Sequence, residues 1–300
     1  QSAQNEQSEL QAFHSFYRIN SDSIDIDPRR VKERVVQLME QTGDSLAYYN
    51  YLAVILKTYL RISEIDSAKL LIRELETFTN TQPPSPDLAD LQSECSNMKG
   101  NIYARVGSMD SAVMCFQKAY EQRMLGTKVE VVPDILMNFA DANNRLGKLD
   151  VSALWYRRAL FLCDSLSISS TKKPPIYYGL AQIYVTLRDF EQCDYYYQLA
   201  AEGYEEMLPY EKYIFLNNRG TSYYYRGDYS VAIGYFKRVI ELVEDYPDML
   251  FELNLSRLNL GDCFLQLNEA DSAAGCMRKC EPFFKKLNAS TALYYLDTQK

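Results

Sequence analysis

Small and bulky side chains recur along this chain with a fixed helical spacing. Six times, a small residue is followed four positions later by a bulky one: Ala68/Ile72, Ala112/Phe116, Ser152/Tyr156, Cys193/Tyr197, Ala232/Phe236 and Ala273/Met277. The small positions are 44, 40, 41, 39 and 41 residues apart. Because residues four apart share one face of a helix, each copy predicts a helix that presents a small and a large residue to a neighbour.

A second motif precedes each copy, with a small residue followed three positions later by an aromatic one. It is clear at Gly100/Tyr103, Ala181/Tyr184, Gly220/Tyr223 and Gly261/Phe264, and weaker at Leu56/Tyr59 and Ala140/Asn143. Turn signals separate the two motifs at Gly107-Ser108, Gly147-Lys148, Arg188-Asp189, Gly227-Asp228 and Asn268-Glu269. Gly and Asn readily take the left-handed conformation that ends a helix, so each copy predicts a helix, a tight turn and a second helix.

The residue types fit close packing between the two helices of a pair, because Gly or Ala on one helix leaves room for an aromatic ring from the other. This pattern resembles the tetratricopeptide repeat family, and the best matches are Gly220, Tyr223, Ala232 and Phe236, and Gly100, Tyr103, Ala112 and Phe116. The resemblance covers residues 44–288. It implies an all-α, right-handed superhelical solenoid of antiparallel helix pairs with about six repeats plus flanking helices.

The chain departs from the family in its period, which is near 40 residues rather than about 34. In this respect it is similar to the long-repeat input segments of bacterial regulatory proteins. We expect a polar arm at 1–27, a capping helix at 28–43 and a further helix at 289–300. Since a solenoid end needs a polar cap, either this last helix is the cap or the chain is cut from a longer protein, and we favour the second interpretation. Gln1 fits a mature terminus or an internal boundary, which leaves a periplasmic and a cytoplasmic location both open.

Composition narrows the class of partner. The chain is 47% hydrophobic but has only 12 Gly and 10 Pro, too few for a many-turned sheet protein. Its formal net charge of -8 disfavours contact with a nucleic acid backbone, so we expect no nucleic acid partner. No apolar stretch is long enough to span a bilayer.

Catalytic motifs are missing from the sequence. His14 is the single histidine, which leaves a Ser or Cys nucleophile without an obvious base. Neither a G-x-G-x-x-G nor a P-loop motif occurs. Cys276 and Cys280 are one helical turn apart, but no further ligand pair accompanies them. Cys193 and Cys280 fall on inward repeat positions, so core packing is the favoured interpretation for these two. We therefore expect no enzyme activity, no cofactor and no metal.

The resemblance implies that ligands bind an inner surface built by the first helix of each pair. It assigns to that surface Lys57, Arg61, Asn101, Arg105, Asp141, Asn144, Arg145, Tyr178, Gln182, Asn217, Thr221, Tyr224 and Tyr225, with Leu258, Asp262 and Gln266 in the last copy. Arg61, Arg105 and Arg145 hold equivalent positions and could grip carboxylates, although a basic residue before a turn is also ordinary helix C-terminal chemistry. The later copies are more aromatic and neutral, which would suit a peptide with an acidic and a hydrophobic segment. The family's carboxylate clamp for C-terminal tails is not reproduced.

Two functions from different classes remain open at this point. The first is a scaffold that binds a protein or peptide, as the sensory or regulatory part of a bacterial signalling or transcription-regulatory protein, with homodimerisation left open. The second is a helical-toroid enzyme or binding protein for carbohydrate, since the chain has 25 tyrosines. The toroid predicts carboxylates that converge at one pole and no short motif that recurs in register. The recurring register favours the scaffold.

Overall fold

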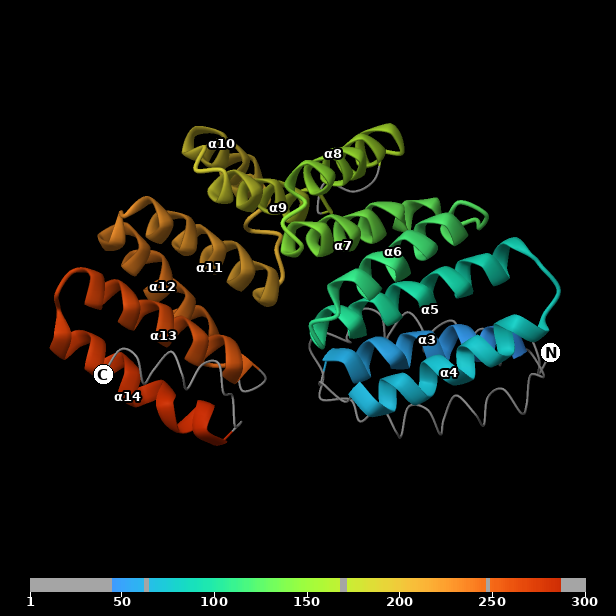
Figure 1. Ribbon diagram of the computed structural model, residues 1–300, viewed down its shortest axis with the longest axis horizontal. Helices are drawn as coiled ribbons and strands as arrows, with labels where there is room; N and C mark the ends of the chain where they lie inside the picture. Colours follow the sequence, from blue (N-terminus) through green and yellow to red (C-terminus); the bar gives the residue numbers. More distant parts are fainter. Residues whose placement is uncertain (1–44, 62–64, 168–171, 247–248, 287–300) are drawn as a thin grey trace. The chain divides into compact units, whose positions relative to one another are not determined.

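The computed structural model describes residues 45–61, 65–167, 172–246 and 249–286, and every regular element in these ranges is helical (Figure 1). The expected arm at 1–27, capping helix at 28–43 and helix at 289–300 lie outside the described residues. Within the described part, no helix is long and apolar enough to cross a membrane.

The chain divides into two compact units, Gln1–Leu166 and Ser167–Lys300. In the first unit the helices are α3 (Ser45–Arg61), α4 (Ile65–Thr81), α5 (Pro86–Arg105), α6 (Met109–Arg123), α7 (Val132–Arg145) and α8 (Leu149–Ser165), with a short 3-10 helix, η1 (Val129–Val131), before α7. In the second they are α9 (Lys173–Thr186), α10 (Phe190–Ala201), α11 (Pro209–Arg226), α12 (Tyr229–Val243), α13 (Leu250–Gln266) and α14 (Ala270–Lys286). Each odd-numbered helix packs against the even-numbered helix that follows it. The six predicted pairs are therefore present.

Five turns between paired helices share one geometry. The predicted turn residue has a positive φ at Gly107 (82°), Gly147 (74°), Arg188 (57°), Gly227 (90°) and Asn268 (62°). In each turn the next N–H donates to the carbonyl five residues earlier, over 2.8 to 2.9 Å. These bonds satisfy carbonyls that the end of the first helix would otherwise leave unpaired.

The predicted contact between small and large residues is confirmed inside the pairs. A Cβ atom at Gly100 would stand 2.5 Å from Phe116 Cε1, and one at Gly220 would stand 3.0 Å from Phe236 Cε1. Both rings are almost fully buried. The glycine therefore lets the ring of the second helix lie directly on the backbone of the first.

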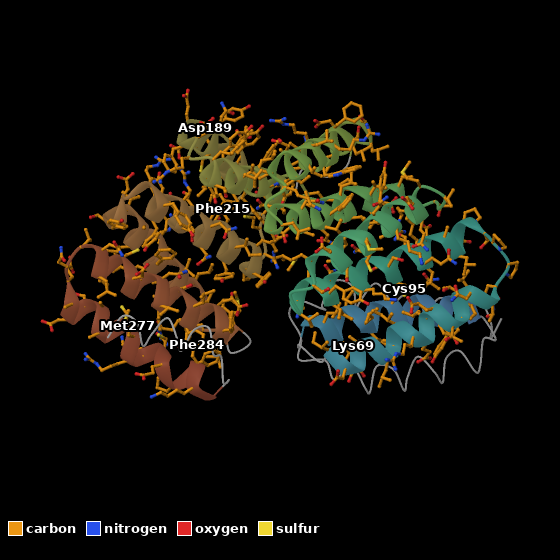
Figure 2. All side chains as sticks on the ribbon, in the orientation of Figure 1. Lys69, Cys95, Asp189, Phe215, Met277 and Phe284 are labelled. Carbon is orange, nitrogen blue, oxygen red and sulfur yellow. The ribbon has the colours of Figure 1, made fainter. Side chains whose placement is uncertain are left out.

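The core of each unit lies between its helices. In the first unit Cys95 of α5 is buried among residues of α3 and α4, while Lys69 of α4 is exposed (Figure 2). In the second unit Phe215, Met277 and Phe284 are buried. The buried Cys280 confirms the prediction that this thiol belongs to the core.

Successive first helices also contact one another, α3 with α5 and α5 with α7 in one unit, and α9 with α11 and α11 with α13 in the other. Second helices contact the next first helix, as α6 does with α7 and α12 with α13. Within each unit the first helices therefore form a continuous layer, and this layer carries the expected ligand residues.

A buried ion pair shapes the connection between α6 and α7. Asp90 of α5 accepts hydrogen bonds from Thr127 N at 3.0 Å and Thr127 Oγ1 at 2.9 Å, and pairs with Arg123 Nη1 at 2.7 Å. Gly126 lies against the same carboxylate, because a Cβ there would stand 2.0 Å from Asp90 Oδ1. One side chain of a first helix thus holds the loop that leads to the next one.

Candidate functional site

Amide side chains join neighbouring first helices in both units. In the first, Asn138 Nδ2 of α7 donates to Asn97 Oδ1 of α5 over 3.0 Å. In the second, Asn259 Nδ2 of α13 donates to Asn217 Oδ1 of α11 over 3.2 Å. The two units therefore repeat the same contact between consecutive first helices.

The repeat register makes these two contacts equivalent. Asn97 and Asn217 each lie three residues before the small residue of their first helix, at Gly100 and Gly220. Their partners, Asn138 and Asn259, lie two residues before the small residues of the next first helices, Ala140 and Gly261. In each contact the partner's position in the repeat is therefore one residue later. We call the half-buried or buried amides on this face the amide strip: Asn97, Asn101, Asn138 and Asn144 in the first unit, and Gln182, Asn217 and Asn259 in the second.

Two amides of the strip keep their hydrogen-bonding groups available. Asn101 of α5 and Asn144 of α7 are half-buried, and neither side chain has a hydrogen-bond partner among the described residues. A primary amide offers two donors and one acceptor oxygen, which matches the N–H and C=O groups of a peptide backbone. These two side chains are the expected ligand residues of the first unit that remain free to act.

The predicted cations of the first unit have partners within the chain. Lys57 Nζ lies 2.7 Å from Glu94 Oε1, and Arg145 Nε lies 3.1 Å from Asp141 Oδ2. The Arg105 guanidinium donates to the carbonyl oxygen of Leu60 on α3. Arg61 ends α3, but its side chain is not among those described. The geometry thus gives Lys57, Arg105 and Arg145 internal roles besides the ligand role expected from the sequence.

Glu94 lies between two cations of different kinds. Its Oε1 pairs with Lys57 of α3, and its Oε2 lies 3.5 Å from Arg123 Nη2 of α6. Arg123 is almost fully buried, whereas Lys57 is exposed. Glu94 therefore links the exposed Lys57 of α3 to the buried Arg123 of α6.

The expected residues of the second unit divide into polar and aromatic ones. Gln182 of α9 donates to the hydroxyl of buried Tyr197 and, over 3.3 Å, to the carbonyl oxygen of Asn218 on α11. Thr221 Oγ1 donates to the carbonyl oxygen of Asn217 over 2.9 Å. Gln182 therefore connects two first helices, as the asparagine pair does one repeat further on.

Aromatic residues lie within about one helical turn of these polar residues on α9 and α11. Tyr178 of α9 and Tyr224 of α11 are half-buried, and Tyr225 is 58% exposed. The rings of Tyr224 and Tyr225 meet edge to face with centroids 5.8 Å apart. An exposed tyrosine next to polar amides offers apolar contact area together with a hydroxyl group.

Sequence reasoning missed Asn97, Asn138 and Asn259 and the bonds between the helices. The sequence did contain a signal for these bonds. One copy has an asparagine three residues before its small residue, and the next copy has an asparagine two residues before its own small residue. In the described part of the chain, no three His, Cys, Asp or Glu side chains are grouped so as to hold a metal ion.

Comparisons with known proteins agree with this geometry. One model of the tetratricopeptide repeat matches residues 93–123 and 174–202, and a second model of the same repeat matches residues 217–279. No curated protein matches the sequence.

Solved structures of regulatory proteins share the fold. One is a Rap protein complexed with competence and sporulation factor, at TM-score 0.76 and 12% identity over 98% of this chain and 80% of that one. Another is the quorum sensor NprR in complex with its cognate peptide NprX, at TM-score 0.68 and 13% identity over 99% and 82%. The apo form of NprR from B. thuringiensis has a TM-score of 0.66 and 14% identity over 99% of this chain and 81% of that one.

At these identities the likeness extends to the fold alone. The family matches fall in both units: two of them each cover most of a helix pair, and the match at 217–279 runs from within α11 into α14. The all-helical solenoid that the resemblance implied is confirmed, and both units of this chain contain segments that match models of the tetratricopeptide repeat.

Proposed function

We propose that this chain is a non-catalytic scaffold that binds a peptide, or an extended segment of a protein, along the amide strip of its first helices. The observation that carries the proposal is the pair of free amides at Asn101 and Asn144, which lie on the same first helices of the first unit as the bonded pair Asn97 and Asn138. In this role the chain would serve as the sensory or regulatory part of a bacterial signalling or transcription-regulatory protein.

An amide strip suits a peptide because an extended backbone offers alternating donors and acceptors that no helix or sheet of its own satisfies. Asparagine can bond both kinds of group, whatever the side chains of the ligand. Rigid helices hold these amides, so little conformational entropy is lost when a ligand binds. Specificity then falls to the neighbouring charged and aromatic side chains.

The similar structures support the choice of a peptide as ligand. The Rap and NprR structures named above contain a competence and sporulation factor and a cognate peptide, respectively. The helical-toroid alternative finds no support in the reported family matches or structures. Selection for an acidic peptide by Arg105 and Arg145 stays a prediction, and their internal partners would have to be exchanged for the ligand.

The test uses a synthetic library of random, C-terminally amidated heptapeptides passed over the immobilised chain. Retained peptides are sequenced, and the Kd of the tightest is measured by fluorescence anisotropy. Paired variants then remove the amides, Asn101→Ala with Asn144→Ala in one unit and Asn217→Ala with Asn259→Ala in the other. Since each lost hydrogen bond costs about 1 kcal/mol, we expect one paired variant to weaken binding roughly 10-fold or more.

Gln117→Ala supplies the matched control, because Gln117 is an exposed amide on α6, a second helix. Its removal should leave the Kd unchanged. A library from which nothing is retained, or a Kd that neither paired variant alters, would contradict the proposed function.

A further inference from the structure

Asp262 of α13 is a buried carboxylate that lacks a partner. Its relative exposure is 7%, and its Oδ1 atom accepts no hydrogen bond. No ion pair involves this side chain among the described residues. A carboxylate can only accept hydrogen bonds, so it cannot satisfy itself by donating elsewhere. Each such group in a folded protein calls for an explanation.

Two other buried side-chain atoms in the described residues lack a hydrogen bond, but each has an opposite charge near it. Glu94 Oε1 lies 2.7 Å from Lys57 Nζ, and Arg226 Nε lies 3.9 Å from Asp228 Oδ2. Asp262 has no such neighbour. On its own helix, Arg257 is directed to Glu244, with 3.8 Å between Nη2 and Oε1. Of these three buried atoms in the described residues, only Asp262 Oδ1 belongs to a side chain without an ion pair.

The repeat register places Asp262 in line with ligand positions of the other copies. It directly follows the small residue Gly261, as Asn101 follows Gly100 and Thr221 follows Gly220. It also lies three residues after Asn259, whose amide bonds to α11, so the two side chains share one face of α13. Asp262 thus extends the amide strip with a charged member.

The chemistry of the missing partner follows from the acceptor. A nitrogen that carries both a positive charge and N–H donors forms hydrogen bonds roughly twice as strong as those of neutral groups, and low exposure reduces competition from water. Burial raises the pKa of the adjacent Cys263 thiol to about 12, and the carboxylate of Asp262 adds to this rise. The net charge of -8 attracts cationic ligands at longer range.

We propose that Asp262 anchors a cationic nitrogen of the bound peptide, supplied by a Lys or Arg side chain or by the free amino terminus. This inference rests on the proposed function and adds the ligand's charge to it. The anchor would fix one end or one residue of the peptide on the first helices of the second unit, beside the amides of that unit.

The test uses the random heptapeptide library in two forms, one with acetylated and one with free amino termini. Peptides retained by the wild-type chain and by Asp262→Asn are identified by mass spectrometry. If a side chain supplies the cation, Lys and Arg should be enriched roughly 10-fold at one position of the acetylated library. If the terminus supplies it, the free-amine library should be retained in similar excess. Asp262→Asn should abolish the preference and leave retention of neutral peptides unchanged.

Asp271→Asn is the matched control, because Asp271 is an exposed carboxylate in the first turn of α14. The Asp271→Asn variant should keep the preference for peptides with Lys, Arg or a free amino terminus. Retention of neutral peptides without preference for either cation overturns the inference and leaves the proposed function standing. Retention of no peptide at all overturns both. A preference that survives Asp262→Asn also overturns the inference.

Thermal unfolding gives a second readout that needs no peptide. Since the isolated carboxylate has no partner among the described residues, Asp262→Asn should raise the Tm by roughly 2 °C or more. Asp194→Asn removes a carboxylate that pairs with Arg219 at 2.7 Å and Arg226 at 2.9 Å, and should lower it. A lower Tm for Asp262→Asn would assign this side chain a structural role and overturn the inference.

Discussion

Arg123 and Asp90 form an ion pair of 2.7 Å although each side chain is only 2% exposed. Arg123 also donates to Ser93 Oγ over 3.1 Å, so the guanidinium is bonded to two side chains of α5. A buried pair of this kind is costly to break, because removal of one partner leaves the other charge buried and alone. The pair therefore makes the junction of α5, α6 and the following loop sensitive to single substitutions.

Replacement of Arg123 by Met should destabilise the chain strongly. We expect the free energy of unfolding to fall by about 3–5 kcal/mol, because Asp90 loses its buried counter-charge. Urea unfolding followed by circular dichroism measures the change. Arg145→Met removes an exposed arginine paired with Asp141 on the same helix, for which the expected loss is about 0.5 kcal/mol or less. Equal losses for the two variants would contradict the role assigned to the buried pair.

The same carboxylate makes stability depend on pH. Burial by itself would raise the pKa of Asp90, but hydrogen bonds from Thr127 and the charge of Arg123 outweigh it and lower the pKa below its usual value. A lowered pKa in the folded state adds stability above the unfolded-state pKa of about 4, and this stability is lost as the pH falls through the folded-state pKa.

The urea midpoint should therefore fall between about pH 5 and pH 2, and fall less in Asp90→Asn than in the wild type. The variant should already be less stable near neutral pH. Identical pH profiles for the two proteins would mean that other carboxyl groups account for the acid sensitivity.

One substitution should have opposite effects at two glycines. Gly100→Ala places a Cβ atom 2.5 Å from the ring of buried Phe116, so the ring or the helix must move and stability should fall by about 1–3 kcal/mol. Gly234 lies inside α12 with nothing within 4 Å of a Cβ, and there Ala should stabilise by about 0.5–1 kcal/mol. Thermal melts of the two variants check the sign. A gain at position 100 would contradict the close contact.

The cysteines should differ in reactivity according to burial. Burial raises the pKa of the thiol to about 12 for Cys95 and about 11 for Cys280, which leaves little reactive thiolate near neutral pH. Cys115 and Cys276 are half-exposed, and their pKa values are raised chiefly by burial. With N-ethylmaleimide and peptide mapping, these two should be modified first in the native chain, and all seven should react alike in urea.

The sequence predicts those features that depend on residues close together within one repeat. The Gly100–Phe116 contact and the left-handed turns at Gly107 and Asn268 follow from local spacing, because helix geometry and turn chemistry act over a few residues. The register, combined with the ligand positions that the resemblance implies, also places Asn101 and Asn144 on the first-helix layer. For these features, the position of a residue within the repeat is enough to predict where it lies in the structure.

Contacts between repeats could not be read in the same way. Asn97 and Asn138 are 41 residues apart and meet with an offset of one residue, which depends on how two helices rotate against each other. Inside one pair, Asp90 and Arg123 are 33 residues apart and meet because α6 packs back along α5, which brings the end of one helix to the start of the other. Whether Asp262 has an ion-pair partner depends on where the side chains of neighbouring helices place their positive charges. A short sequence motif contains no information about this.

The shared turn geometry has a consequence for how this chain can change in length. Each of the five turns is closed by hydrogen bonds inside its own helix pair, so its shape does not depend on which pair comes before or after. A whole pair could therefore be duplicated or deleted without rebuilding any turn, whereas the loss of a few residues inside a pair would break one. Variation among proteins built in this way should come in steps of one complete pair, and each step would lengthen or shorten the ligand surface by one first helix.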